Sequence, residues 1–346
     1  MRGIATLLVF VGILSFLGAQ DNSPEKEGMG LFSSDSLLEL TLWLDLEEIR
    51  GDLGEDPSYH DATLAYKDPE NQAEVLMYIQ VRARGSFRKN PENCDFPPLK
   101  IKFDNSDNKR SILSTIREVK LVTHCQSGER EFEQYVLQEY LIYKGYNLFT
   151  NFSFRVRLIR LTYVDISAGN DSLTRFAFMI EDAGEMAERN LGEILELKSV
   201  TGDKLDQHQY ALMSLYNYMI LNTDYSVPIM HNVELVSIDH FKPPIPVPYD
   251  FDWSGIIDIP YDSPFADRET RYTAHRYKGP CLKMRELEEL FIYMEDRNRS
   301  LYMLYHEFPY LNEEMKSRCL QELNMFYITI GNKELVRQEF IKNCLD

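Results

Sequence analysis

The sequence predicts an α+β protein in which a strand-rich half precedes a helix-rich half. Apolar residues alternate with period two through much of residues 37–182, which is the pattern of half-buried strands. Beyond that stretch the apolar spacing becomes helical, and most of residues 183–346 keep it. A sheet-rich layer followed by a helix-rich layer leaves a cleft between them, so we expect two lobes with a boundary near residues 181–184.

The N-terminus has the three parts of a secretory signal peptide. Arg2 precedes an apolar run over residues 4–17, and Gly18 and Ala19 are small enough for cleavage. An uncleaved anchor is the alternative, but the run is shorter than the roughly 20 residues that a spanning helix needs. We therefore expect an exported protein, periplasmic or extracellular, with residues 1–19 removed and no stable membrane span.

Local patterns predict the order of elements. A polar, turn-rich stretch, residues 20–36, is expected to be a flexible leader. Alternation predicts strands at residues 38–44, 75–82, 99–103, 118–123, 155–163 and 174–180, with a turn at 51–57 and a hairpin-like break at 171–172. Helices are expected at residues 129–143, 183–197, 204–221 and through most of the chain after residue 285, with short strands at 233–238 and 246–249.

The net charge of −18 argues against nucleic acid as the main partner, because phosphate backbones attract Lys and Arg. An acidic cleft would suit a metal ion instead.

Five cysteines are present, and an odd number leaves at least one free or paired between chains. Proximity in the sequence is the only guide to their pairing. On that basis we expect Cys94 to pair with Cys125 and Cys319 with Cys344, which leaves Cys281.

Two acidic segments are the strongest chemical feature of the chain. Asp224 follows a helix-like run, and Asn232 lies shortly after it. Asp250 and Asp252 follow a strand-like run, where they point to the same side; we prefer Asp250 as a ligand and keep Asp252 in reserve. Carboxylate and amide oxygens suit Mg²⁺, which takes few protein ligands. A lone Asp more often caps or turns the chain, but this combination is what phosphoryl transfer requires.

These segments resemble the catalytic and metal-binding stretches of the CotH-type spore-coat protein kinases, and in particular their exported bacterial branch. The resemblance spans roughly residues 75–290 and rests on residues 82–88, 94–103, 120–125, 222–226, 231–232 and 248–255. The chain lacks the Gly-rich loop and the His-Arg-Asp triplet of ordinary protein kinases.

The resemblance implies an atypical protein-kinase-like fold of two lobes, a strand-rich N-terminal lobe and a helix-rich C-terminal lobe. It implies transfer of the γ-phosphate of ATP to Ser or Thr of a protein, with Mg²⁺ or Mn²⁺ as the metal. In that reading Asp224 accepts the proton of the substrate hydroxyl, and Asn232 and Asp250 bind the metal. Arg84 and Gly85 lie near the phosphates.

The phosphate-binding lysine stays open between two strands. Lys102 is the choice by resemblance, and Lys100 is a weaker option on the same strand. Lys120 lies in the last strand before the first helix, which offers Glu133 or Glu139 as an ion-pair partner.

Ile180 and Glu181 end a strand where the resemblance puts the link between lobes, and an apolar strand end followed by backbone polar groups suits adenine. We expect His231, beside the proposed metal ligand, to be a hydrogen-bonded structural histidine. Two rival functions remain: a non-catalytic scaffold, and transfer of the nucleotide (AMP) rather than of phosphate.

Overall fold

Seven strands close into a barrel in the part of the chain that the computed structural model describes, residues 30–69, 71–85, 87–104, 111–257, 259 and 275–345. In sheet order they are β1 (Leu38–Leu44), β2 (His60–Lys67), β3 (Glu74–Ala83), β4 (Leu99–Phe103), β5 (Glu118–Val122), β7 (Asp171–Ile180) and β6 (Val156–Asp165). Neighbouring strands pair antiparallel except β1 and β6. Those two run parallel, with Leu38 opposite Ile159, and their pairing closes the barrel.

Alternation along each strand fills the barrel with apolar side chains. In β1, Leu38, Leu40, Leu42 and Leu44 are at most 3% exposed, whereas the residues between them face outward. Strands of this composition form a half-buried pleated surface, so one face becomes the barrel core and the other faces outward.

The predicted two-lobe, kinase-type α+β fold is wrong, because the main sheet is this closed barrel of mixed strand direction, accompanied by a small separate sheet. Two long-range facts overturn it. β2 was not expected as a strand, yet it pairs with both β1 and β3. The parallel pairing of β1 with β6 then removes the open edge that a separate sheet would have had.

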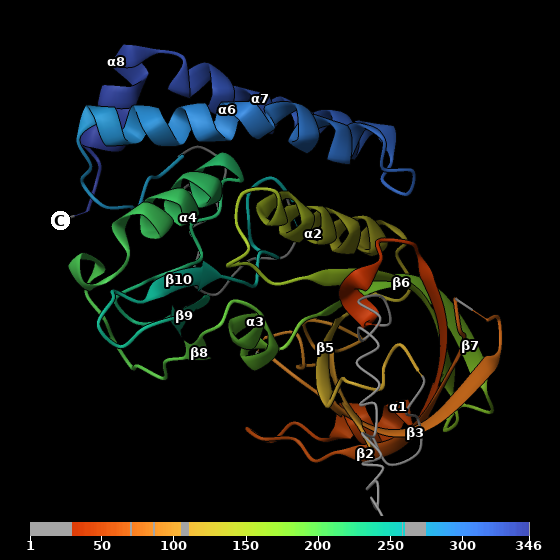
Figure 1. The fold of residues 1–346 in the computed structure, drawn as a ribbon. Coiled ribbons are helices and arrows are strands. Elements are labelled where there is room, and N and C mark those ends of the chain that lie inside the picture. Colours follow the sequence, from red (N-terminus) through yellow and green to blue (C-terminus); the bar gives the residue numbers. More distant parts are fainter. Residues whose placement is uncertain are drawn as a thin grey trace, which may run out of the picture.

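The small sheet and the helices lie beside the barrel (Figure 1). The sheet has the order β10 (Ile245–Pro248), β9 (Val233–Ser237) and β8 (Glu193–Ile194), all antiparallel. The helices are α1 (Leu46–Gly51), α2 (Glu131–Asn147), α3 (Ala183–Arg189), α4 (Gln207–Met219), α6 (Met284–His306), α7 (Glu313–Ile330) and α8 (Lys333–Val336). Single turns are η1 (Leu31–Ser33), η2 (Gly202–Lys204) and the π-helical η3 (Arg337–Ile341).

In Figure 1, α6 and α7 form an outer layer over α2 and α4, and α2 and α4 in turn cover the barrel and the small sheet. One apolar core joins these layers. It contains buried residues of β5, β6 and β7 together with those of α2, α4, α6 and α7. The helix α2, although it comes between two barrel strands in the chain, is therefore packed on both sides.

Several element boundaries differ from the sequence prediction by a few residues, and two of the differences have local reasons. The helix expected over residues 183–197 ends at Arg189, and β8 follows. A Cβ at Gly192 would lie 2.7 Å from the carbonyl oxygen of Ser237, so the chain there runs close against β9. The break between β6 and β7 lies before Asp171, not at residues 171–172 as expected. Gly169 and Asn170, which form part of this break, have positive φ.

The disulfide Cys94–Cys125 is confirmed, but the predicted pair Cys319–Cys344 is wrong. Cys344 pairs with Cys281, because the C-terminal segment returns to the start of α6, where Leu345 N donates to Gly279 O. Cys319 is a free, buried thiol on α7.

Residues 1–29, which hold the expected signal peptide and the first part of the expected leader, lie outside the described residues. Among the helices that the structure describes, none has the length and apolar character needed to cross a bilayer.

Candidate functional site

A buried asparagine pair fixes the loop that follows α4. The Asn222 side chain donates to Asn217 Oδ1 over 2.8 Å, and its own Oδ1 accepts from the backbone N–H of Asp224 over 2.9 Å. Asn217 belongs to α4 and donates to Met213 O of the same helix. The position of Asp224 is therefore set by the last turns of α4.

The Asp224 carboxylate is held by two side chains of the same loop. His231 Nε2 lies 3.1 Å from Oδ1, and Asn232 Nδ2 donates to Oδ2 over 3.0 Å and to the Asp224 carbonyl over 2.8 Å. Asn232 has a φ of +54°, a left-handed conformation that asparagine tolerates better than most residues. Because its nitrogen is committed to Asp224, the amide oxygen of Asn232 is the atom that could bind a metal.

The second acidic segment reaches the same place from the end of β10. Tyr249 N donates to Asn232 O over 3.1 Å, which ties the two segments together. The next residue, Asp250, has a φ of +59°, and its N–H donates to the buried hydroxyl of Tyr143 on α2 over 2.8 Å. Asp252 lies 3.9 Å from Arg88 Nη1.

A cavity of about 370 Å³ brings these groups together. Its lining includes the proposed catalytic and metal-binding residues Asp224, Asn232, Asp250 and Asp252, the proposed phosphate-binding residues Arg84 and Gly85, and also Arg88, His231, Glu139 and Trp253. Thus most of the site residues expected from the sequence meet in one place, although they come from four separate parts of the chain.

Burial raises the pKa values of three carboxyl groups of the cavity, Asp252, Glu139 and Asp224, and neighbouring carboxylates add to the rise. Burial raises the pKa of Asp252 to about 7, with the nearby Asp250 adding to the effect and Arg88 opposing it. Burial also raises the pKa of Glu139 well above its usual range, again reinforced by Asp252 and Asp250. For Asp224, burial raises the pKa while His231 opposes the rise. Like charges crowded in a buried site favour either a proton or a cation.

The donor set fits a hard divalent cation. Its candidate oxygens come from two carboxylates, Asp250 and Asp252, and from the Asn232 amide. Mg²⁺ typically takes one or two carboxylates and keeps several waters. Within the described ranges, no three His, Cys, Asp or Glu residues are arranged as a ready-made ligand set. The fit to Mg²⁺ or Mn²⁺ rests on the type of donor, two carboxylates and an amide oxygen, with water completing the shell.

The lysines on neighbouring strands have different surroundings. Lys102 of β4 points outward, is exposed, and has its ammonium 5.4 Å from the centre of the Tyr59 ring. Lys100 forms an ion pair with Glu118. The structure does not bring either lysine to the lining of the cavity.

Lys120 of β5 is likewise not in the lining of the cavity, but it lies near the second acidic segment. Its ammonium lies 5.1 Å from the centre of the Tyr249 ring, and burial, then Arg84, lower its pKa while Asp250 opposes the shift. Of the two carboxylates expected to pair with it, Glu133 forms an ion pair with Arg175, and Glu139 lies beside the aspartates of the cavity.

Ile180 and Glu181 are not in the lining of this cavity. Ile180 is buried at the end of β7, where it is opposite Lys120 and Val156. The Glu181 carboxylate is 0% exposed and binds Arg155 and Arg189, and its backbone N–H donates to Arg155 O. Its polar groups are thus largely committed to the protein itself.

Sequence reasoning did not assign a site role to Arg88, Tyr143 or Trp253. Arg88 belongs to the Arg-Gly segment that carried the family resemblance, so its motif could have identified it. Trp253 lies in the stretch 248–255 that carried the resemblance, whereas no sequence signal singled out Tyr143, and only the packing of α2 against the segment after β10 brings Tyr143 to Asp250.

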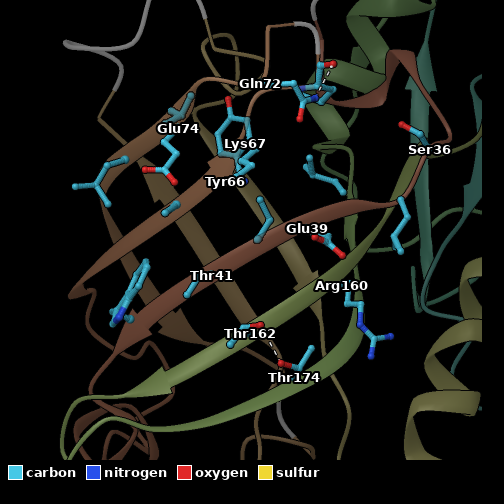
Figure 2. Close-up of a pocket in the computed structure, with 18 residues that line it drawn as sticks. Ser36, Glu39, Thr41, Tyr66, Lys67, Gln72, Glu74, Arg160, Thr162 and Thr174 are labelled. Carbon is cyan, nitrogen blue, oxygen red and sulfur yellow. Dashed lines mark hydrogen bonds between the residues drawn. The ribbon is translucent and has the colours of Figure 1, made fainter.

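A larger hollow, of about 850 Å³, lies on the outer wall of the barrel (Figure 2). Residues of β1, β2, β3, β6 and β7 line it, among them Thr162 and Thr174, which hydrogen-bond to each other over 2.9 Å. Its lining contains none of the cavity's aspartates and only scattered charges such as Glu39 and Arg160. The acidic, amide and guanidinium groups that could act together line the smaller cavity instead.

Comparison with known proteins does not assign a family. No protein-family model matches the chain, and the search of curated proteins likewise gave no match. The site is therefore interpreted from its own residues and geometry.

Proposed function

We propose that this protein transfers the γ-phosphate of ATP to a Ser or Thr hydroxyl of a protein substrate, with Mg²⁺ or Mn²⁺ as cofactor. The observation that supports this best is the convergence of Asp224, Asn232 and Asp250 with two guanidinium groups, Arg84 and Arg88, on one cavity. Phosphoryl transfer depends on positioning and on neutralising charge, and this cavity contains groups for both tasks.

Asp224 is the proposed base. Its carboxylate is oriented by His231 and Asn232, and burial raises its pKa, which makes it a better proton acceptor than an exposed aspartate. In this proposal it orients the substrate hydroxyl and accepts its proton.

The cations of the cavity are proposed to hold the nucleotide phosphates. Arg84 and Arg88 come from the segment after β3, and Gly85 between them has a φ of +77° and no atom within 4 Å of a Cβ position, so a phosphate can approach the backbone. Asn232, Asp250 and Asp252 would hold the metal, which when bound neutralises phosphate charge.

Export remains part of the proposal. The two disulfides, Cys94–Cys125 and Cys281–Cys344, support it, because such bonds persist mainly in oxidising compartments.

Labelled ATP tests the reaction. Purified residues 20–346 are incubated with Mg²⁺ or Mn²⁺, a mixture of candidate proteins, and ATP labelled at the α or the γ phosphate. We expect γ label in protein with the parent, and about 100-fold less or lower still with Asp224→Asn, since a positioned base contributes at least that much. The exposed Asp61→Asn variant is the matched control.

Incorporation of the α label would show nucleotide transfer and overturn the kinase proposal. An absence of both labels, together with no thermal shift on adding ATP and metal, would contradict both activities and leave a non-catalytic scaffold.

A further inference from the structure

Lys278 contacts the residues on both sides of Asp224. Its ammonium donates to the carbonyl of Thr223 over 2.6 Å and to the carbonyl of Tyr225 over 3.0 Å. It also lies 5.1 Å from the centre of the Tyr225 ring, within the range of a cation–π interaction. One side chain thus bridges the main chain around the proposed base.

The position of this lysine is energetically costly. Burial lowers the pKa of Lys278, and Arg276 lowers it further, whereas Asp224 opposes the shift. A buried ammonium needs strong acceptors to offset its lost hydration. Here the acceptors are main-chain carbonyls of the Asp224 loop, so the cost of burial is linked to the conformation of that loop.

The segment that carries Lys278, residues 275–281, is fixed along α4. His275 Nδ1 lies 3.2 Å from Tyr218 O near the end of that helix, and Tyr210 near its start donates to Lys278 O over 2.8 Å. Cys281 then binds the segment to the C-terminus through Cys344. We call residues 275–281 the strap.

We propose that Lys278 is a positioning residue for Asp224 and that the strap holds it in place. The lysine fixes the carbonyls of Thr223 and Tyr225, and the backbone between them determines where the Asp224 carboxylate points. Small errors in the direction of a reacting group are enough to lower a rate severely. The catalytic part of this inference rests on the proposed function, whereas the positioning part does not.

Hydrogen exchange followed by mass spectrometry tests the positioning directly. In Lys278→Met we expect peptides from residues 220–232 to exchange about tenfold faster, because the loop opens locally more often, while β4 peptides keep the parent rate. Lys278→Arg, which retains a charged donor, should restore most of the protection. Lys283→Met, an exposed lysine two residues beyond the strap, is the matched control.

Unchanged exchange in residues 220–232 would overturn the inference, whatever the phosphate assay shows. Faster exchange throughout the protein, β4 included, would also contradict a local positioning role. If the parent transfers phosphate, we further expect Lys278→Met to lower kcat about tenfold or more with KM for ATP within about twofold, since Lys278 affects orientation rather than nucleotide binding. If the parent transferred no labelled phosphate to protein, only the proposed function would be contradicted.

Discussion

Asp252 and Glu139 illustrate how the site differs from a collection of surface acids. Asp252 comes from the segment after β10 and Glu139 from α2, where it is 3% exposed. Burial raises the pKa of both, and Asp250 adds to each effect. Carboxylates in this arrangement destabilise the metal-free protein once they ionise, and a bound cation relieves that repulsion.

The stability of the metal-free protein should therefore depend on Asp252 in a definite pH window. Its pKa rises from 3.8 to about 7 on folding, so between those values the folded state binds more protons than the unfolded state. Stability consequently falls as pH rises through this window. In EDTA, Asp252→Asn should be more stable than the parent at pH 8 by on the order of 3 kcal/mol, and nearly equal at pH 4.

Urea unfolding at both pH values measures this difference, with Asp61→Asn as the control for an exposed aspartate. Adding Mg²⁺ should stabilise the parent more than the variant, because the variant keeps Asn232 and Asp250 but lacks the second carboxylate. If the free energy of unfolding changed with pH in the same way for the parent and for Asp252→Asn, a raised pKa of Asp252 would be contradicted.

At the scale of elements, two adjacent barrel strands present lysines to different surroundings. β4 directs Lys102 outward beside Tyr59, whereas β5 directs Lys120 toward Tyr249 and Asp250. The alternation of apolar residues predicted both strands. It could not indicate which strand's outward face would be covered by the small sheet.

Lys120→Met should weaken ATP binding in the presence of Mg²⁺ by about tenfold, since a hydrogen bond to a charged group contributes roughly 1.5–3 kcal/mol. Lys102→Met should leave the affinity within about twofold of the parent. Calorimetric titration with a non-hydrolysable ATP analogue measures both. The opposite order of effects would assign the phosphate contact to β4 and contradict a role for Lys120 in binding ATP.

At the scale of the whole molecule, one apolar cluster joins the outer face of the barrel strands β5, β6 and β7 to the helices, while the barrel interior forms a second cluster. Val122, Leu158 and Phe178 of the barrel belong to the same core as Leu215 of α4 and Phe326 of α7. A core shared in this way couples the unfolding of the parts that it joins.

We expect a single calorimetric transition for residues 20–346 under non-reducing conditions, with the calorimetric and van't Hoff enthalpies equal within about 10–20%. Leu215→Ala removes a core side chain from α4. It should lower the midpoint of thermal unfolding by the same amount whether unfolding is followed by a probe in the barrel or by one in the helices. Two separate transitions would show that barrel and helices unfold independently.

The sequence predicted what is local and missed what is brought together by tertiary packing. β1 and β4 lie within their predicted bounds because alternation is a property of neighbouring residues. The acidic loops were recognisable because Asp224, Asn232 and Asp250 form compact motifs. Barrel closure and the Tyr143 contact could not be predicted, because they depend on partners far apart in the chain.

The Lys278 strap and the Cys281–Cys344 disulfide were missed for the same reason. The disulfide depends on the C-terminus returning to the start of α6, and the strap depends on Lys278 reaching Thr223, 55 residues earlier in the chain; spacing along the sequence encodes neither contact.

The parallel pairing of β1 with β6 has a consequence for how this chain acquires its structure. β1 is the first barrel strand to be synthesised, but β2 to β5 and α2 must all follow before β6 exists. Until then one edge of β1 has no partner from its own barrel and is open to pairing with other chains. Closing so long a loop is slow, so the interval between synthesis and closure is when this protein most needs protection from aggregation.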